Sequence, residues 1–154
     1  MTQLDSIYNT KILELAAAIP RTARLAHPDA TATAHSKLCG STVTVDIVVD
    51  NDVIVDFGQT VKACLLGQAA ASLVGREIVG TTGQEIRAVG ETMRAMLKEN
   101  GSPPTGKWAD LAVLEPVRDY KARHTSTLLV FEAITRALDE IASRGSPSGA
   151  VRSA

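Results

Sequence analysis

Two cysteines are the side chains of this sequence best suited to chemistry. Cys39 lies in Leu-Cys-Gly-Ser and Cys64 lies 25 positions later in Ala-Cys-Leu, and the sequence holds no third cysteine. A structural zinc or iron-sulfur site ordinarily takes four protein ligands, and two thiolates supply half of that set. The chemistry of the pair therefore depends on what completes the site.

The residues between the cysteines predict how the two thiols are positioned. Residues 42–58 alternate apolar and polar side chains around Asp50-Asn51-Asp52, which predicts a β-hairpin. The threonine-rich segment 30–38 predicts a flanking strand, and the alanine-rich run 65–74 predicts a helix. One hairpin with its exits can bring both thiols to the same end of a sheet.

Cys64 is then expected at a helix N-terminus. The partial positive charge and free N–H groups of such a terminus stabilise a thiolate, so Cys64 is the more metal-competent thiol of the pair. Gly40, beside Cys39, lets a metal or a partner's backbone approach closely. The alternative stays open that both cysteines are small buried apolar residues.

The rest of the sequence predicts helices around this core and a single domain. The spacing of apolar residues predicts helices over residues 4–19, 84–99, 108–114 and 122–142. Pro20 ends the first of these helices, and Asn100-Gly101 ends the second. Serine, glycine and proline dominate residues 143–154, which predicts a disordered tail after a domain of residues 1–142.

Composition excludes some classes of partner. Lysine plus arginine (16) balance aspartate plus glutamate (17), and aromatic residues are only 3% of the 154, so we expect no nucleic-acid partner. No targeting segment and no apolar run of about 18 residues is evident, so we expect a cytoplasmic protein with no membrane partner. Reducing conditions there disfavour a Cys39–Cys64 disulfide and favour metal or sulfur chemistry.

Three segments resemble the U-type iron-sulfur cluster assembly scaffolds, the family of IscU, SufU and the NifU N-terminal domain. They are Lys37–Ser41, Phe57–Gly75 and, in the manner of the SufU branch, Trp108–His124 with the last helix. The resemblance implies an α+β fold, a three-stranded antiparallel sheet packed against four to five helices. It also implies a scaffold rather than an enzyme, accepting sulfur from a cysteine desulfurase and working with other iron-sulfur assembly factors.

The same resemblance implies a ligand set, from which this sequence departs. Family members hold zinc or a nascent, transient [2Fe-2S] cluster with three cysteines and an aspartate. Cys39 and Cys64 match the first two cysteines, while Ser41 stands at the aspartate position and Ser126 at the third cysteine position. A serine hydroxyl is a poor ligand for thiophilic metals, so both changes are expected to weaken metal binding.

His124 is the candidate replacement ligand, because some family members use a histidine close to the third cysteine. Cys39, Cys64 and His124 with a water would make a reasonable metal site. Two alternatives stay open: His124 faces solvent at a helix N-terminus, or Thr125 and Ser126 simply cap the last helix.

Other polar residues have simpler interpretations. His35 is expected on an exposed strand position, with a ligand role as the lesser alternative, and His27 beside Pro28 in a turn. Asp46, Asp50, Asp52 and Asp56 are expected to form a solvated face of the hairpin.

Three hypotheses remain for function. The first is a scaffold or carrier that binds iron, zinc, a nascent [2Fe-2S] cluster or persulfide sulfur through Cys39 and Cys64. The second is a degenerate family member that acts as a metal-free protein-binding module. The third uses Cys64 as a nucleophile with His124 as base, but no third orienting group is evident, so a sulfur acceptor is expected rather than a stand-alone enzyme.

Overall fold

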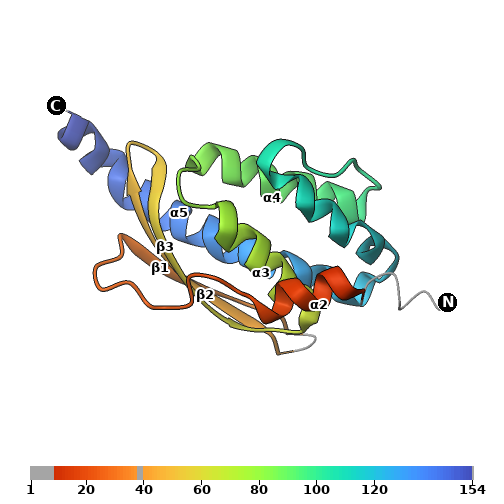
Figure 1. Ribbon diagram of the computed structural model, residues 1–154. Coiled ribbons are helices and arrows are strands. Elements are labelled where there is room, and N and C mark those ends of the chain that lie inside the picture. The colour runs from red at the N-terminus through yellow and green to blue at the C-terminus, as the bar shows by residue number, and fades with distance from the viewer. Residues whose placement is uncertain (1–8, 38–39, 154) are drawn as a thin grey trace.

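The fold is a three-stranded sheet with helices packed on one face. The computed structural model describes residues 9–37 and 40–153, with side chains up to residue 144. Strands β1 (Ala30–His35), β2 (Thr42–Asp50) and β3 (Val53–Lys62) pair antiparallel in the order β1-β2-β3. The helical elements are α2 (Thr10–Ala17), α3 (Leu65–Glu77), α4 (Gly83–Lys98), η1 (Gly106–Asp119), η2 (Lys121–Arg123) and α5 (His124–Ser153), of which η1 and η2 are 3-10 helices (Figure 1). The predicted α+β fold class is confirmed.

The hairpin between β2 and β3 turns where the sequence predicts it. Asn51 and Asp52 form a two-residue connection with φ of 51° and 66°. Positive φ at both positions is the signature of a type I′ turn, whose twist matches that of the strands it joins. The resulting alternation buries Val43, Val45 and Ile47 completely on the inner face of the sheet.

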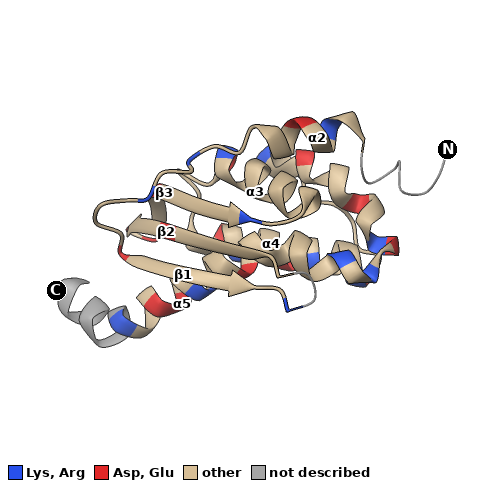
Figure 2. Ribbon diagram, turned by 90° about the horizontal axis from the view of Figure 1, so that it is seen from below, with Lys and Arg blue, Asp and Glu red and all other residues tan. Residues whose placement is uncertain are grey.

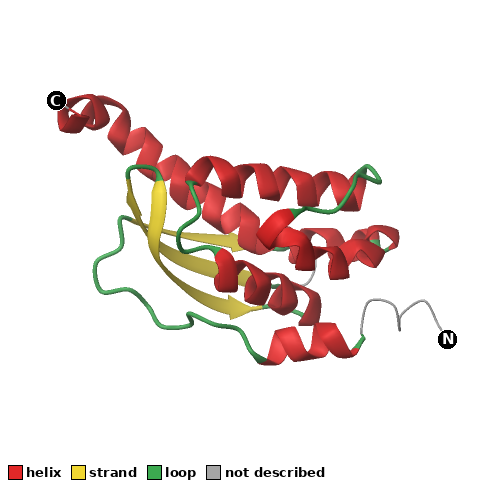
Figure 3. Cartoon of the chain, turned by 45° about the horizontal axis from the view of Figure 1, so that its top comes forward, coloured by secondary structure: helices red, strands yellow, loops and turns green. Residues whose placement is uncertain are grey.

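The helices form a layer over one face of the sheet (Figure 3). Helix α5 packs on β1 and β2, and α3 packs on β3 and beside α5. Helices α2, α4 and η1 lie outside these two. Consecutive alanines in α3, residues 69–71, are fully buried and let its neighbours approach closely. The sheet and α3 therefore share one apolar core.

The outer face of the sheet has no helix over it in the described part of the chain (Figure 2). One carboxylate on this face is nevertheless buried. Asp46 is 1% exposed and accepts hydrogen bonds from Arg24 at 2.7 and 3.1 Å, from the Leu25 N–H at 3.0 Å and from the Thr31 hydroxyl at 2.6 Å. Burial acts to raise the pKa of Asp46, but these hydrogen bonds outweigh it and hold the pKa below its usual value.

The prediction of a solvated acidic face is therefore wrong for Asp46 and correct for Asp50, Asp52 and Asp56, which are exposed. The difference arises because the segment before β1 crosses the sheet and covers Asp46. At Gly58 a Cβ would lie 2.3 Å from the Ala23 carbonyl oxygen, so only glycine allows that crossing.

The C-terminal end of the chain is described only in part. The backbone of α5 is helical to Ser153, but the side chains after residue 144 are not described, and the disordered tail at 143–154 stays a prediction.

Among the described residues, no helix combines the length and apolar character needed to cross a membrane.

Candidate functional site

The loop between β1 and β2 carries the first cysteine in the sequence. The Ser36 N–H donates to the Ser41 carbonyl at 2.8 Å, and the Gly40 N–H donates to the Ser36 carbonyl at 2.9 Å. Gly40 has a φ of 72°, which glycine adopts without strain. Cys39 itself lies outside the described residues, and the prediction that it joins the site stays a prediction.

The strand register brings this loop and the second cysteine to one end of the sheet. Thr42 pairs with His35 on one side and with Lys62 on the other, so the end of β3 lies opposite the start of β2. Cys64 follows two residues after Lys62 and is the N-cap residue of α3. The expected position of Cys64 at a helix N-terminus is confirmed.

Cys64 contacts Ser126 directly. The Cys64 Sγ lies 3.3 Å from the Ser126 Oγ, and the Cys64 thiol makes no capping bond to its own helix. Ser126 is 1% exposed and its hydroxyl also donates to the Arg123 carbonyl at 3.3 Å. The Ser126 hydroxyl has one proton to donate. When the Cys64 thiol is neutral, Ser126 can donate this proton to the Arg123 carbonyl, and when Cys64 is a thiolate, Ser126 can donate it to the sulfur instead.

Close packing of two helices explains this contact. A Cβ at Gly67 would lie 2.9 Å from the Ser126 carbonyl oxygen and 2.9 Å from the Ala63 Cβ. Glycine at position 67 therefore lets the start of α5 approach the first turn of α3. Cys64 is only partly buried, whereas Ser126 beside it is buried.

His124 has a different environment from the one expected. It is 3% exposed, and its Nε2 lies 3.1 Å from the Val117 carbonyl oxygen and 3.0 Å from that of Arg118. Carbonyls only accept hydrogen bonds, so Nε2 carries a proton and donates it. The solvent-facing alternative is wrong, and Nδ1 is the only ring nitrogen left to act as a metal ligand.

The capping alternative for Thr125 and Ser126 is also wrong, because α5 begins at His124 and both residues lie inside it. A capping hydroxyl accepts a hydrogen bond from a backbone N–H, whereas Ser126 and Thr127 both donate to the carbonyl of Arg123. Helix α5 begins at His124, directly after η2, so positions 126 and 127 already lie inside it.

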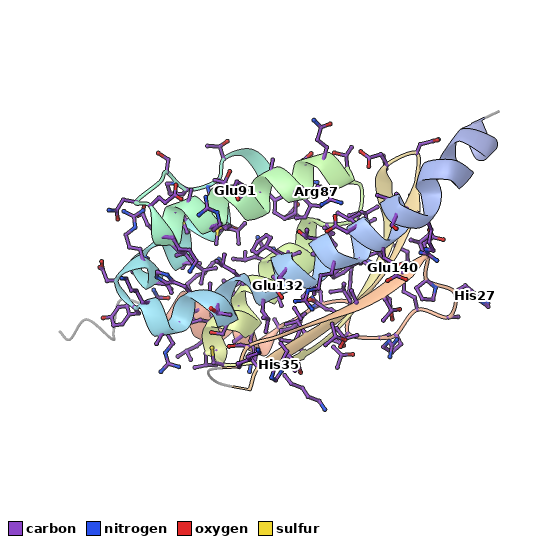
Figure 4. All side chains as sticks on the ribbon, turned by 180° about the vertical axis from the view of Figure 1, so that it is seen from behind. His27, His35, Arg87, Glu91, Glu132 and Glu140 are labelled. Carbon is purple, nitrogen blue, oxygen red and sulfur yellow. The ribbon has the colours of Figure 1, made fainter. Side chains whose placement is uncertain are left out.

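The other candidates lie around the same sheet. Ser41 is buried next to the start of β2, at the end of the sheet that holds Cys64. His35 is exposed at the end of β1 and His27 is exposed before it, at the far end (Figure 4). Within residues 9–37 and 40–153, no group of three or more histidine, cysteine, aspartate or glutamate side chains could hold a metal ion.

The described donor set is therefore one thiol with a serine hydroxyl beside it. Such a pair can bind one sulfur atom covalently, or supply one ligand to a soft metal whose remaining ligands come from elsewhere. It cannot close a tetrahedral metal site alone.

Comparison with known proteins gives consistent relatives. The chain is 51% identical to the N-terminal part of a nitrogen-fixing NifU-like protein from Brucella abortus, covering 92% of this chain and 99% of that structure, with a TM-score of 0.90. It is 26% identical over 103 residues to the iron-sulfur cluster assembly scaffold protein IscU of Thermotoga maritima, covering 67% of this chain and 72% of IscU.

A third relative shares the fold at lower identity. The structure of a putative iron-sulfur cluster assembly scaffold protein for the SUF system from Fervidobacterium islandicum is 21% identical, with a TM-score of 0.80 over 87% of this chain and 98% of that one. No family model matches the chain.

Proposed function

Since this chain belongs to the U-type iron-sulfur cluster assembly scaffold family, we propose that it carries iron, zinc, a nascent [2Fe-2S] cluster or persulfide sulfur through Cys39 and Cys64. The supporting observation is the setting of Cys64, a partly buried residue at the N-terminus of α3 with its Sγ 3.3 Å from the Ser126 Oγ. Its partners would be a cysteine desulfurase and other iron-sulfur assembly factors, in the cytoplasm.

The surroundings of Cys64 suit an anionic sulfur. The first N–H groups of α3 have no partner within the helix, and together with the helix dipole they favour negative charge at its N-terminus. The Ser126 hydroxyl adds one more donor from the buried side. Ser41 and Ser126 would then act as hydrogen-bonding groups rather than as metal ligands, and the cargo would be held by fewer thiolates and released more easily.

Persulfide transfer to Cys64 needs no outside oxidant. The Cys64 thiolate attacks the terminal sulfur of a persulfide on the desulfurase, a new S–S bond forms at Cys64, and the desulfurase cysteine leaves as a thiolate. One S–S bond forms while another breaks, so the step balances in atoms and electrons. The only requirement is a reachable thiolate.

The proposal is tested by elemental analysis of protein purified without oxygen. Near-stoichiometric iron or zinc is expected in the native sequence and in Ser126→Ala, because the hydroxyl is not a ligand. Cys39→Ser and Cys64→Ser are each expected to lose the metal. Metal absent from the native protein, even after addition of iron and sulfide, would count against the carrier function.

A metal-free binding module is the second candidate, because two family ligand positions are serine and the His124 Nε2 is occupied by backbone carbonyls. This candidate predicts that a double variant, Cys39→Ser with Cys64→Ser, still binds a cysteine desulfurase with unchanged affinity. A partner that is lost only together with the thiols would contradict it.

A further inference from the structure

Cys64 lies in a two-residue link between a strand and a helix. The last pair of the β2–β3 ladder at this end of the sheet is Thr42 with Lys62, and α3 begins at Leu65. Ala63 and Cys64 therefore belong neither to the paired sheet nor to the interior of the helix. Contacts outside the strand ladder must fix the backbone of this link if the thiol is to keep one orientation.

Gln68 binds the carbonyls on both sides of Cys64. Its side-chain Nε2 donates to the Ala63 carbonyl at 2.7 Å, and its backbone N–H donates to the Cys64 carbonyl at 2.9 Å. Because peptide groups are planar, the φ and ψ of Cys64 set how the two peptide groups that flank it are turned. One residue thereby holds both angles of Cys64, φ at −66° and ψ at 171°.

The positions of Ala63 and Gln68 are those at which many helices fix the entry of the chain. Ala63 directly precedes the N-cap residue, and Gln68 is the fourth residue of α3. Apolar side chains at these two positions commonly pack together and set the angle at which the chain enters the helix. Ala63 offers only one methyl group, and the hydrogen bond from Gln68 to its carbonyl takes the place of that apolar contact.

The orientation of the Cys64 thiol differs from that of an ordinary N-cap side chain. A serine or aspartate at an N-cap usually accepts a hydrogen bond from an N–H of the first helical turn. The Cys64 side chain makes no such bond, and its Sγ lies 3.3 Å from the Ser126 Oγ instead. With the backbone held on both sides, rotation about χ1 alone moves the sulfur.

We propose that Gln68 is a positioning residue for Cys64, which acts through the backbone to hold the thiol against Ser126 and away from the N–H groups of α3. This role rests on the proposed function, because a fixed sulfur matters where Cys64 holds a cargo. Groups of a binding site must keep their geometry to within about 0.5 Å. A thiol on a loosely held link would not meet that limit.

The test compares alkylation rates of the full chain in the Cys39→Ser background, where Cys64 is the only thiol. Gln68→Met keeps the approximate length and the helix preference of glutamine but cannot donate to the Ala63 carbonyl. It is expected to raise the rate with iodoacetamide about fivefold, the factor that corresponds to one net hydrogen bond. Gln84→Met makes the same change at an exposed position in the first turn of α4 and should leave the rate unchanged.

A double variant tests whether Gln68 acts through the contact with Ser126. Ser126→Ala should also raise the alkylation rate, because it removes the group that the thiol contacts. Gln68→Met combined with Ser126→Ala should react no faster than the faster single variant, since both changes release the same contact. Increases that multiply in the double variant, or an unchanged rate in Gln68→Met, overturn the role of Gln68.

Nuclear magnetic resonance separates an effect on the backbone from an effect on the side chain. The three-bond coupling between the N–H and Hα of Cys64 reports its φ, and it should change in Gln68→Met but not in Ser126→Ala. An unchanged coupling in Gln68→Met overturns the role, and circular dichroism confirms that each variant is folded. Both measurements are made without metal or sulfide, so they decide the role of Gln68 independently of whether the carrier function holds.

Discussion

Replacing Ser126 by cysteine should restore a metal ligand that the sequence lacks. Two sulfurs bound to one tetrahedral zinc at about 2.3 Å each lie about 3.8 Å apart. The Ser126 Oγ lies 3.3 Å from the Cys64 Sγ, so a sulfur at position 126 needs a shift of only about 0.5 Å. The longer C–S bond and the partial exposure of Cys64 make that shift easy.

The expected gain in affinity follows from the energy of a structural zinc site. Such sites draw on roughly 10 to 16 kcal/mol over four ligands, or about 3 kcal/mol for each. A gain of about 3 kcal/mol corresponds to an affinity increase of roughly 100-fold. The gain should appear in a competitive titration of zinc against a chromophoric chelator, with a reductant present so that the thiol introduced by Ser126→Cys does not form a disulfide with Cys64.

The matched control places a new thiol elsewhere on the same core. Ser72 is also 1% exposed, lies on α3 and donates to the Ala18 carbonyl. It is eight residues beyond Cys64, about 12 Å along the helix, so Ser72→Cys cannot share a metal with Cys64. Zinc affinities that are equal in Ser126→Cys and Ser72→Cys would refute the reasoning that position 126 adjoins the metal site.

Three further predictions concern stability. Asp46→Ala should lower the free energy of unfolding, measured by urea denaturation, by about 3 kcal/mol, because the Arg24 guanidinium and two other donors lose a buried acceptor. A change near zero would contradict the burial of this carboxylate. Because folding lowers the pKa of Asp46, its contribution is present above its unfolded value of about 3.9 and is lost as the pH falls through the folded pKa, so the difference in urea midpoint between native protein and Asp46→Ala should shrink in acid. Gly67→Ala should lower the free energy of unfolding by about 1 to 3 kcal/mol, because the new Cβ would lie 2.9 Å from the Ser126 carbonyl oxygen. It should also increase the rate of alkylation of Cys64, because α5 must move away from α3. An unchanged melting temperature and alkylation rate would argue against that close approach.

The parts of the fold that depend on local patterns could be predicted from the sequence. The alternation of Val43, Val45 and Ile47 and the turn at Asn51-Asp52 place the hairpin correctly, since a strand's period and a type I′ turn are encoded by neighbouring residues. The alanine-rich run after Cys64 likewise predicts α3. These patterns also place Cys64 at the helix N-terminus.

The parts of the fold and of the site that depend on contacts between distant segments could not be predicted from the sequence. Asp46 is buried by a segment about twenty residues earlier that has no periodic pattern, so nothing local distinguishes it from the exposed aspartates. The hydrogen bonds from the His124 Nε2 to the carbonyl oxygens of Val117 and Arg118 depend on where the 3-10 helix η1 lies relative to the start of α5. Ser126 was open to interpretation as a cap because a hydroxyl near a helix start is typical of one, whereas its partner Cys64 is 62 residues away.

Anaerobic reconstitution tests the central claim, that Cys39 and Cys64 together hold the cargo, most directly. The native protein is incubated with ferrous iron and sulfide and desalted, and iron and sulfide per chain are measured with the absorption spectrum, beside Cys39→Ser, Cys64→Ser and Ser126→Ala. We expect bound iron and sulfide in the native protein and in Ser126→Ala, and loss of both in each cysteine variant. Binding that is unchanged without either cysteine, or absent from the native protein, would contradict the account.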